Sequence, residues 1–169
     1  MTLLLIAILI GALCFMAIVL FGAPYVPSLR KEVRQAFIEL YPLRATDTVV
    51  DLGAGDGAVL VEAARYGAQC YAVELNPLLA LIAKLRLGNS ATVTVANMWL
   101  YKLPSDVTLV YVFSVSRDMA KLHAYMQREA ERLQKPITLM TFGATLSDRD
   151  SVAYRNAHTL YKFSPLQAD

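Results

Sequence analysis

The sequence has little of the chemistry that marks a metalloprotein or a disulfide-stabilised protein. Its 169 residues include two cysteines, Cys14 and Cys70, and two histidines, His123 and His158. None of them has partners at the spacing of metal ligands, which predicts that the protein holds no metal. A disulfide is not expected either, because Cys14 lies in an apolar run and Cys70 in a segment typical of a buried strand.

The charge balance and the length exclude further classes of protein. The formal net charge is only +2, which is too small to indicate a nucleic-acid-binding protein. The sequence has no internal repeat and no low-complexity segment, and it is too short for a second large domain. We therefore expect one folded domain without a nucleic-acid partner.

The N-terminal segment lacks charge altogether. No charged residue occurs from Thr2 to Ala23, and at about 1.5 Å per residue a helix of this length reaches across the roughly 30 Å core of a bilayer. A cleaved signal peptide fits less well, because no basic region precedes the run. Arg30, Lys31 and Arg34 follow it, so the positive-inside rule predicts a single-pass anchor with the rest of the chain in the cytoplasm. The same basic residues also fit the polar face of the next helix.

Prolines end the apolar run and separate it from the rest of the chain. Pro24 and Pro27 stop a helix and keep the chain extended. A second helix follows, with one apolar face formed by Leu29, Val33, Ala36, Phe37 and Leu40. We expect three segments, which are a transmembrane anchor over residues 1–23, a linker with an N-terminal covering helix over 24–45, and the main domain over 46–169.

From Thr48 onward, segments typical of strands and of helices alternate. The expected strands cover residues 48–52, 69–75, 91–96, 107–113 and 137–142, and the expected helices cover 57–66, 77–87 and 116–134. This alternation predicts an α/β fold with a Rossmann-like parallel sheet and helices on both faces. The tail, with the stretch SVAYRNAHTLYKF, is expected to add one or two antiparallel edge strands.

The stretch VVDLGAGDGAVLVEAARYG places three glycines directly after the first expected strand. Gly53, Gly55 and Gly57 let the backbone turn sharply and approach a ligand closely, because no Cβ atoms intervene. In open α/β sheets such a turn is where nucleotides bind. Glu74 comes at the end of the second strand, where a carboxylate can accept hydrogen bonds from both ribose hydroxyls of an adenosine.

Two cofactors share this geometry. A dinucleotide site requires G-x-G-x-x-G or G-x-G-x-x-A, and Gly53, Gly55 and Ala58 satisfy that pattern. S-adenosylmethionine (SAM) has no phosphate but carries a cationic ammonium and a cationic sulfonium. Asp51 and Asp56 flank the glycines, where either would repel a pyrophosphate. The acids therefore favour SAM, with Asp51 placed to meet the ammonium directly or through water.

These pieces together resemble the class I, seven-strand methyltransferases. More narrowly, they resemble a family of small membrane-anchored protein-lysine methyltransferases, whose eukaryotic members methylate the c-ring protein of ATP synthase and the ADP/ATP carrier of the mitochondrial inner membrane. The resemblance rests on an apolar span followed by PYVPS, and on VVDLGAGDGAVLVEAA, AVELNPLLA, NMW and VYVFSVSRDM. It extends from the span almost to the C-terminus.

The resemblance implies a role for each motif residue. Asp51 and the glycines would surround the methionine part of SAM, Glu74 would hold the ribose, and Leu75 and Asn76 would line the adenine side. Asn97 stands where the family usually has aspartate, near the adenine amino group, and its amide oxygen can accept the same hydrogen bond. The candidate cofactor-binding residues are Asp51, Gly53, Ala54, Gly55, Gly57, Glu74, Leu75, Asn76, Asn97 and Met98.

The methyl acceptor is expected beyond the end of the fourth strand. The residues there, Phe113 and Ser114, are candidates for lining a lysine channel, and a merely structural strand end is the alternative. They do not form the N-P-P-Y motif that holds planar amide or adenine nitrogens in other methyltransferases. Trp99, after the third strand, is expected either to pack against a helix there or to shield the cofactor. No catalytic base is identified.

We therefore expect a membrane-anchored, SAM-dependent methyltransferase that acts on a lysine of a membrane protein by in-line methyl transfer. A methyltransferase for a small molecule such as a lipid or quinone is an alternative. A non-catalytic membrane protein that binds SAM or a nucleotide is another, and a small NAD-dependent oxidoreductase is a third.

Overall fold

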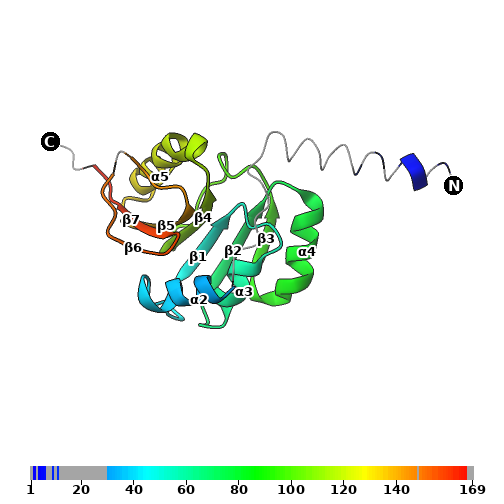
Figure 1. Cartoon of the computed structure of the whole chain (residues 1–169), viewed down its shortest axis with the longest axis horizontal. Helices are drawn as coiled ribbons and strands as arrows, with labels where there is room; N and C mark the ends of the chain where they lie inside the picture. The colour runs from blue at the N-terminus through cyan, green and yellow to red at the C-terminus, as the bar shows by residue number, and fades with distance from the viewer. Residues whose placement is uncertain are drawn as a thin grey trace.

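The structure, a computed structural model, describes residues 2, 4–6, 9, 11, 30–147 and 149–166. Within these residues the chain forms a seven-stranded sheet in the order β3-β2-β1-β4-β5-β7-β6 (Figure 1). The strands are β1 Thr48–Leu52, β2 Gln69–Glu74, β3 Thr92–Val95, β4 Leu109–Ser114, β5 Ile137–Gly143, β6 Ala153–Arg155 and β7 His158–Phe163. The first five are parallel, which confirms the predicted α/β sheet.

The helices form two layers, one on each face of the sheet. Their bounds are α2 Arg30–Glu39, α3 Ala58–Ala64, α4 Pro77–Leu87 and α5 Met119–Leu133, with short 3₁₀ turns η1 Gly88–Ser90 and η2 Ser116–Asp118. Residues of α2, α3 and α4 pack with Val49 and Leu109 in one core, and residues of α5 pack with Val50 and Val110 in the other. Figure 1 shows α2 to α4 beside β1–β3 and α5 beside β4 and β5. Alternate side chains of each central strand therefore point into different cores.

Local sequence signals set the ends of α4 as predicted. The side-chain oxygen of Asn76 accepts hydrogen bonds from the backbone N–H groups of Leu78 (2.9 Å) and Leu79 (3.4 Å). Pro77 occupies the first helical position, where its missing N–H costs nothing. Gly88 follows the last residue with a positive φ of 54°. The start of α4 is thereby fixed directly beside the end of β2.

The tail forms two antiparallel strands, in agreement with the sequence prediction. Of these two, β6 lies at the sheet edge and β7 does not, because β7 pairs with β5 on one side and with β6 on the other. His158 begins β7 opposite Phe142, and its Nε2 lies 3.0 Å from the hydroxyl of Tyr111 on β4. The buried end of β7 is thus tied to the centre of the sheet.

Helix α2 covers the sheet as its apolar spacing predicts. Val33, Ala36 and Phe37 are buried, and the Phe37 ring contacts the edge of Tyr111 with the ring centroids 6.4 Å apart. The preceding position, Leu29, was predicted to share this face and lies outside the described residues. Arg34 of α2 also donates to the buried carboxylate of Glu62 on α3 (3.1 Å). The N-terminal helix is therefore an integral layer of the fold.

The connection between β3 and β4 differs from the sequence expectation. In the described chain, residues 96–108 form turns and irregular backbone, and no helix stands after β3 for Trp99 to pack against. The ring of Trp99 packs instead against Tyr125 of α5, at 6.5 Å between ring centroids. The helix expected over 116–134 is also divided, because its first turn is the 3₁₀ segment η2.

The structure contradicts the predicted single-pass membrane location. None of the described helices is long and apolar enough to cross a membrane. The longest of them, α5, has 15 residues and spans only about 22 Å, short of the roughly 30 Å that a bilayer core requires. Most of the predicted span over residues 2–23 lies outside the described residues, and the boundaries drawn at residues 23 and 45 stay predictions.

Candidate functional site

The glycine turn connects β1 to α3 at the carboxyl edge of the sheet. The backbone N–H groups of Gly53 and Ala54 both donate to the carbonyl oxygen of Val73 (2.8 and 3.0 Å), which holds the turn against β2. Gly53 has a φ of +86°, and a Cβ built there meets no atom within 4 Å. Gly57 has a φ of +80°, and a Cβ there would lie 2.9 Å from Leu87 Cδ1. Gly53 is thus required on the open side of the turn, whereas Gly57 is required where α3 approaches α4.

The carboxylate of Glu74 is oriented by two backbone donors. Its Oε2 accepts a hydrogen bond from the N–H of Gly55, and its Oε1 accepts one from the N–H of Asn76, both at 2.8 Å. The side chain is buried, with 8% of its surface exposed. Each carboxylate oxygen can accept a second hydrogen bond. Glu74 therefore links the turn to the start of α4 and keeps acceptor capacity for a ligand.

Asp51 is the most deeply buried acid of the turn. Only 2% of its surface is exposed, and it lies on the central strand β1 between β2 and β4. Burial raises the pKa of Asp51 to about 8, and the negative charges of Glu74 and Asp56 add to the rise. A cation bound beside Asp51 would lower this pKa and favour the ionised carboxylate. The electrostatics of the turn therefore favour a cationic ligand and disfavour a phosphate.

The second acid of the turn, Asp56, is neutralised by a residue that the sequence analysis missed. Its carboxylate forms an ion pair with Arg86 of α4, and Arg86 also donates to the Asp56 backbone oxygen (3.0 Å). Asp56 Oδ1 further accepts a hydrogen bond from the N–H of Ala58 (3.2 Å). The preference against a pyrophosphate therefore depends mainly on Glu74 and on Asp51, because an anion nearby would disfavour the ionised form of Asp51 still further. No local pattern reveals the pair, because Arg86 lies on the next helix.

Residues predicted for the adenine side lie at the neighbouring strand ends. Leu75 is 55% exposed, and Asn76 is buried with its side-chain oxygen engaged in capping α4. The N–H of Ala96 donates to the backbone oxygen of Glu74 (3.0 Å), which places the end of β3 next to the end of β2. Asn97 is exposed and its side-chain oxygen accepts from the N–H of Trp99 (3.0 Å). Met98 beside it is half-buried against the core under α5.

The candidates for lining the acceptor channel, Phe113 and Ser114, lie at the end of β4 and pair with the end of β5. The Ser114 hydroxyl donates to the backbone oxygens of Ala144 (2.8 Å) and Phe142 (3.4 Å). These contacts match the structural alternative for Ser114, a buried strand end. Phe113 is half-buried beside Phe142, with 6.0 Å between the ring centroids. Its role in a lysine channel stays a prediction.

Comparison with known proteins identifies the family of this chain. Residues 50–140 match the family described as "Methyltransferase domain", a stretch of more than half the chain that contains the glycine turn and Glu74. The chain belongs to this methyltransferase family. The family and the acidic turn together support S-adenosylmethionine as the cofactor, as predicted. The family match and the acidic turn argue against the alternative of a small NAD-dependent oxidoreductase.

Relatives named for a specific activity share just under a third of the aligned residues with this chain. The human lysine N-methyltransferase of the ATP synthase C protein is 29% identical over 113 residues, which are 64% of this chain and 47% of the human protein. Its Xenopus laevis counterpart is 32% identical over 114 residues, which are 64% of this chain and 49% of that protein. The predicted resemblance to such methyltransferases is confirmed. The chain spans about half the length of these relatives.

Solved structures share the fold at lower identity. An RNA methyltransferase from Salinibacter ruber, in complex with S-adenosyl-L-homocysteine, has a TM-score of 0.73 and 20% identity, over 85% of this chain and 97% of that chain. A SAM-dependent O-methyltransferase from Thermotoga maritima has a TM-score of 0.63 and 14% identity, over 87% and 69% of the two chains. Because these proteins are named for different acceptors, the likeness establishes the fold alone.

Proposed function

We propose that this protein is a SAM-dependent protein-lysine N-methyltransferase whose acceptor is a lysine of a membrane protein. The observation that carries the proposal is the pair of buried acids at the glycine turn, in a chain whose relatives are named for lysine methylation of the ATP synthase C protein. The acids fit a cofactor that is cationic and has no phosphate. The names of the relatives support lysine as the acceptor.

The residues of the turn fit the parts of this cofactor. Asp51 meets the ammonium of the methionine part, and the open side of Gly53 lets the backbone lie close to it. Glu74 accepts hydrogen bonds from the ribose hydroxyls with the lone pairs that its two backbone donors leave free. Leu75 and Asn97 lie at the adenine end. When bound, SAM supplies an activated methyl group on a positively charged sulfur.

The protein contributes alignment more than acid–base chemistry. In the transfer, the bond between methyl and sulfur breaks as a bond between methyl and the lysine nitrogen forms. Holding the methyl group and the nitrogen close together lowers the activation free energy by several kcal/mol. The lysine must first release a proton to solvent, because its free pKa is about 10.4. An apolar approach beside Phe113 favours the neutral amine. No dedicated base is required.

The first test is transfer of a labelled methyl group. Purified protein is incubated with methyl-labelled SAM and with membranes from cells that lack the protein. We expect label in a discrete protein band that yields methyllysine on hydrolysis. A variant with both Asp51→Asn and Glu74→Gln is the control, and it should transfer no label. Label confined to the lipid extract would contradict the lysine proposal and favour the small-molecule alternative.

A binding measurement tests the cofactor site by itself. Glu74→Gln keeps the size of the side chain and removes its charge, and hydrogen bonds to charged groups contribute roughly 1.5–3 kcal/mol. We expect SAM affinity, measured by calorimetry, to fall by about ten- to a hundredfold. Unchanged affinity would show that the ribose lies elsewhere.

A further inference from the structure

The segment that carries Asn97 has little regular structure of its own. Between β3 and β4, residues 96–108 form turns and irregular backbone. Its local hydrogen bonds near Asn97 run from Leu100 N–H to Asn97 O (3.0 Å), from Tyr101 N–H to Met98 O (3.4 Å) and from Trp99 N–H to the Asn97 side-chain oxygen (3.0 Å). Turns of this kind do not fix a backbone position on their own. The position of Asn97 therefore depends on what the segment packs against.

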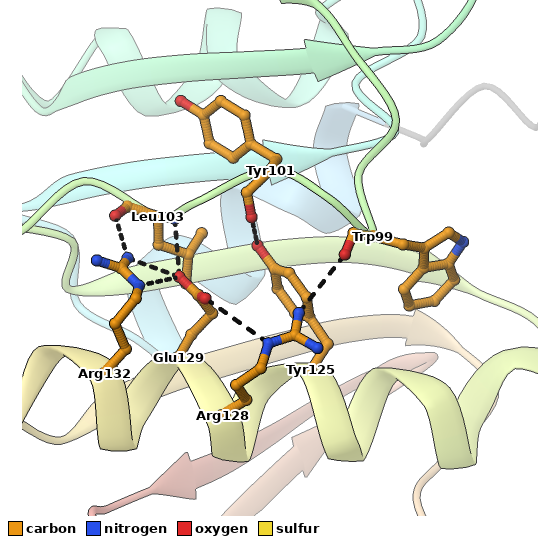
Figure 2. A network of polar contacts seen from close by, with 7 residues as sticks. All are labelled: Trp99, Tyr101, Leu103, Tyr125, Arg128, Glu129 and Arg132. Atoms are coloured by element: carbon orange, nitrogen blue, oxygen red, sulfur yellow. Dashed lines mark hydrogen bonds and ion pairs between the residues drawn. The ribbon is translucent and has the colours of Figure 1, made fainter.

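One face of α5 supplies the missing partners (Figure 2). The Tyr125 hydroxyl donates to the backbone oxygen of Tyr101 (2.9 Å). Glu129 Oε2 accepts from the N–H of Leu103 (2.9 Å), and Arg132 Nη2 donates to the carbonyl oxygen of the same residue (2.6 Å). Side chains one helical turn apart thus bind the backbone of the segment as a neighbouring strand would.

The burial of these side chains makes the contacts specific. Tyr125 is 2% exposed and Glu129 is 3% exposed. Arg132 pairs with the Glu129 carboxylate at 2.6 Å and Arg128 lies 4.0 Å from it, so the buried charge is compensated within α5. The ring of Trp99 packs on Tyr125, and Lys121 Nζ lies 4.5 Å from the centre of the Trp99 ring. A shifted segment would leave buried polar groups unpaired, which holds it in one place.

The other end of the segment is tied to the backbone of Glu74, the residue proposed to bind the ribose. Ala96 N–H donates to the backbone oxygen of Glu74, so Asn97 lies between this anchor and the contacts on α5. We propose that Tyr125, Glu129 and Arg132 are positioning residues that hold Asn97 at the adenine end of the cofactor. They thereby set the preference of the site for adenine. This inference rests on the proposed SAM site.

The test compares two ligands that differ only at the base. S-adenosyl-L-homocysteine has the adenine amino group, and S-inosyl-L-homocysteine has an oxygen there. Wild-type protein should bind the adenine ligand more tightly. Tyr125→Phe removes one hydrogen bond and keeps the ring, and it should lower this preference by about two- to tenfold. Glu129→Ala should lower the preference for the adenine ligand further. Glu129→Gln keeps an acceptor for the N–H of Leu103, so this variant should keep most of the wild-type preference.

Two controls separate positioning from general stability. Tyr161 of β7 is equally buried, and its hydroxyl accepts from the N–H of Leu146 in another loop (2.9 Å). Tyr161→Phe should lower the thermal midpoint about as much as Tyr125→Phe and leave the ligand preference unchanged. Glu74→Gln should weaken both ligands equally, because both contain the ribose.

The outcomes of this experiment are distinct. If Tyr125→Phe weakens both ligands by the same factor, or changes neither, the positioning role is wrong. If the wild-type protein binds both ligands equally, Asn97 does not read the adenine amino group and the inference fails. If the wild-type protein binds neither ligand, the proposed SAM site itself is refuted.

Discussion

Two acids, Asp51 and Glu74, lie near the ends of neighbouring strands and differ in the groups that surround their carboxyls. Glu74 is surrounded by backbone donors, with the N–H groups of Gly55 and Asn76 each 2.8 Å from one of its oxygens. Burial instead raises the pKa of Asp51 to about 8. Asp51 is therefore mainly protonated at neutral pH until a cation arrives. The turn thus contains one acid that is oriented in advance and one whose charge depends on the ligand.

This difference predicts proton release on cofactor binding. At pH 6.5 Asp51 is protonated in the free protein, and pairing with the SAM ammonium favours its ionised form. We expect about one proton to be released per site. Calorimetry in buffers of different ionisation enthalpy measures this number directly. Asp51→Asn should release none and bind SAM at least about tenfold more weakly. Binding by the wild-type protein without proton release would show that Asp51 does not meet the ammonium.

At the scale of elements, the glycine turn serves two separate purposes. Gly53 faces open space, and Gly57 lies where α3 meets Leu87 and Ala83 of α4. Both have positive φ, so a side chain costs about 1–2 kcal/mol of backbone strain at either position. Only at Gly57 does a Cβ also overlap packed atoms, which adds about 1–3 kcal/mol. The two positions therefore allow cofactor binding and helix packing to be tested apart.

We expect Gly57→Ala to lower the free energy of unfolding by about 2–5 kcal/mol. Gly53→Ala should lower it by only about 1–2 kcal/mol, but it should weaken SAM binding more, because its Cβ enters the open side of the turn. Urea unfolding and calorimetry on the same two variants provide the comparison. The assignment of the open side is wrong if Gly53→Ala binds SAM as the wild type does.

At the scale of the whole molecule, the sequence predicted what local patterns determine. Runs of β-branched residues located the strands, and Asn76 and Gly88 located the ends of α4. The glycine turn and Glu74 lie together at the carboxyl edge of the sheet, where the cofactor is proposed to bind. Contacts between distant segments left no such pattern. The pairing of Arg86 with Asp56 joins α4 to the glycine turn. No feature of residues 96–108 shows that side chains of α5 hold this segment in place. A charged residue such as Glu129 within the apolar stripe of its helix was the available signal.

The apolar N-terminal run was predicted to span a membrane from its composition and length. A charge-free stretch as long as residues 2–23 satisfies the length and hydropathy expected of a membrane span. The described helices nevertheless include none that could cross a bilayer. The prediction of the cofactor rests on several residues that agree in type and spacing, and the family match supports it.

Two buried groups link the stability of the whole fold to pH in opposite directions. Burial lowers the pKa of His158 to about 4, below its usual 6.5, so the stability that it contributes is lost as pH falls from 6.5 towards 4. Burial raises the pKa of Asp51 from 3.8 to about 8, so its contribution is lost as pH rises across that interval. Between pH 4 and 6.5 the two effects oppose each other, and above 6.5 only that of Asp51 remains.

Without cofactor, the free energy of unfolding should therefore fall by about 2 kcal/mol between pH 6.5 and 8, as far as these two groups determine it. Asp51→Asn should abolish that fall and leave a rise from pH 4 to 6.5, because only His158 then titrates. His158→Gln should give a decline over the whole interval from pH 4 to 8. Urea unfolding of the three proteins is measured at matched pH values. Subtracting each variant's curve from that of the wild type gives the contribution of the replaced group, because all other titratable groups are the same in the three proteins. If the Asp51→Asn and wild-type curves run parallel from pH 6.5 to 8, the carboxyl is already ionised in the free protein, and the cofactor cannot act by charging it.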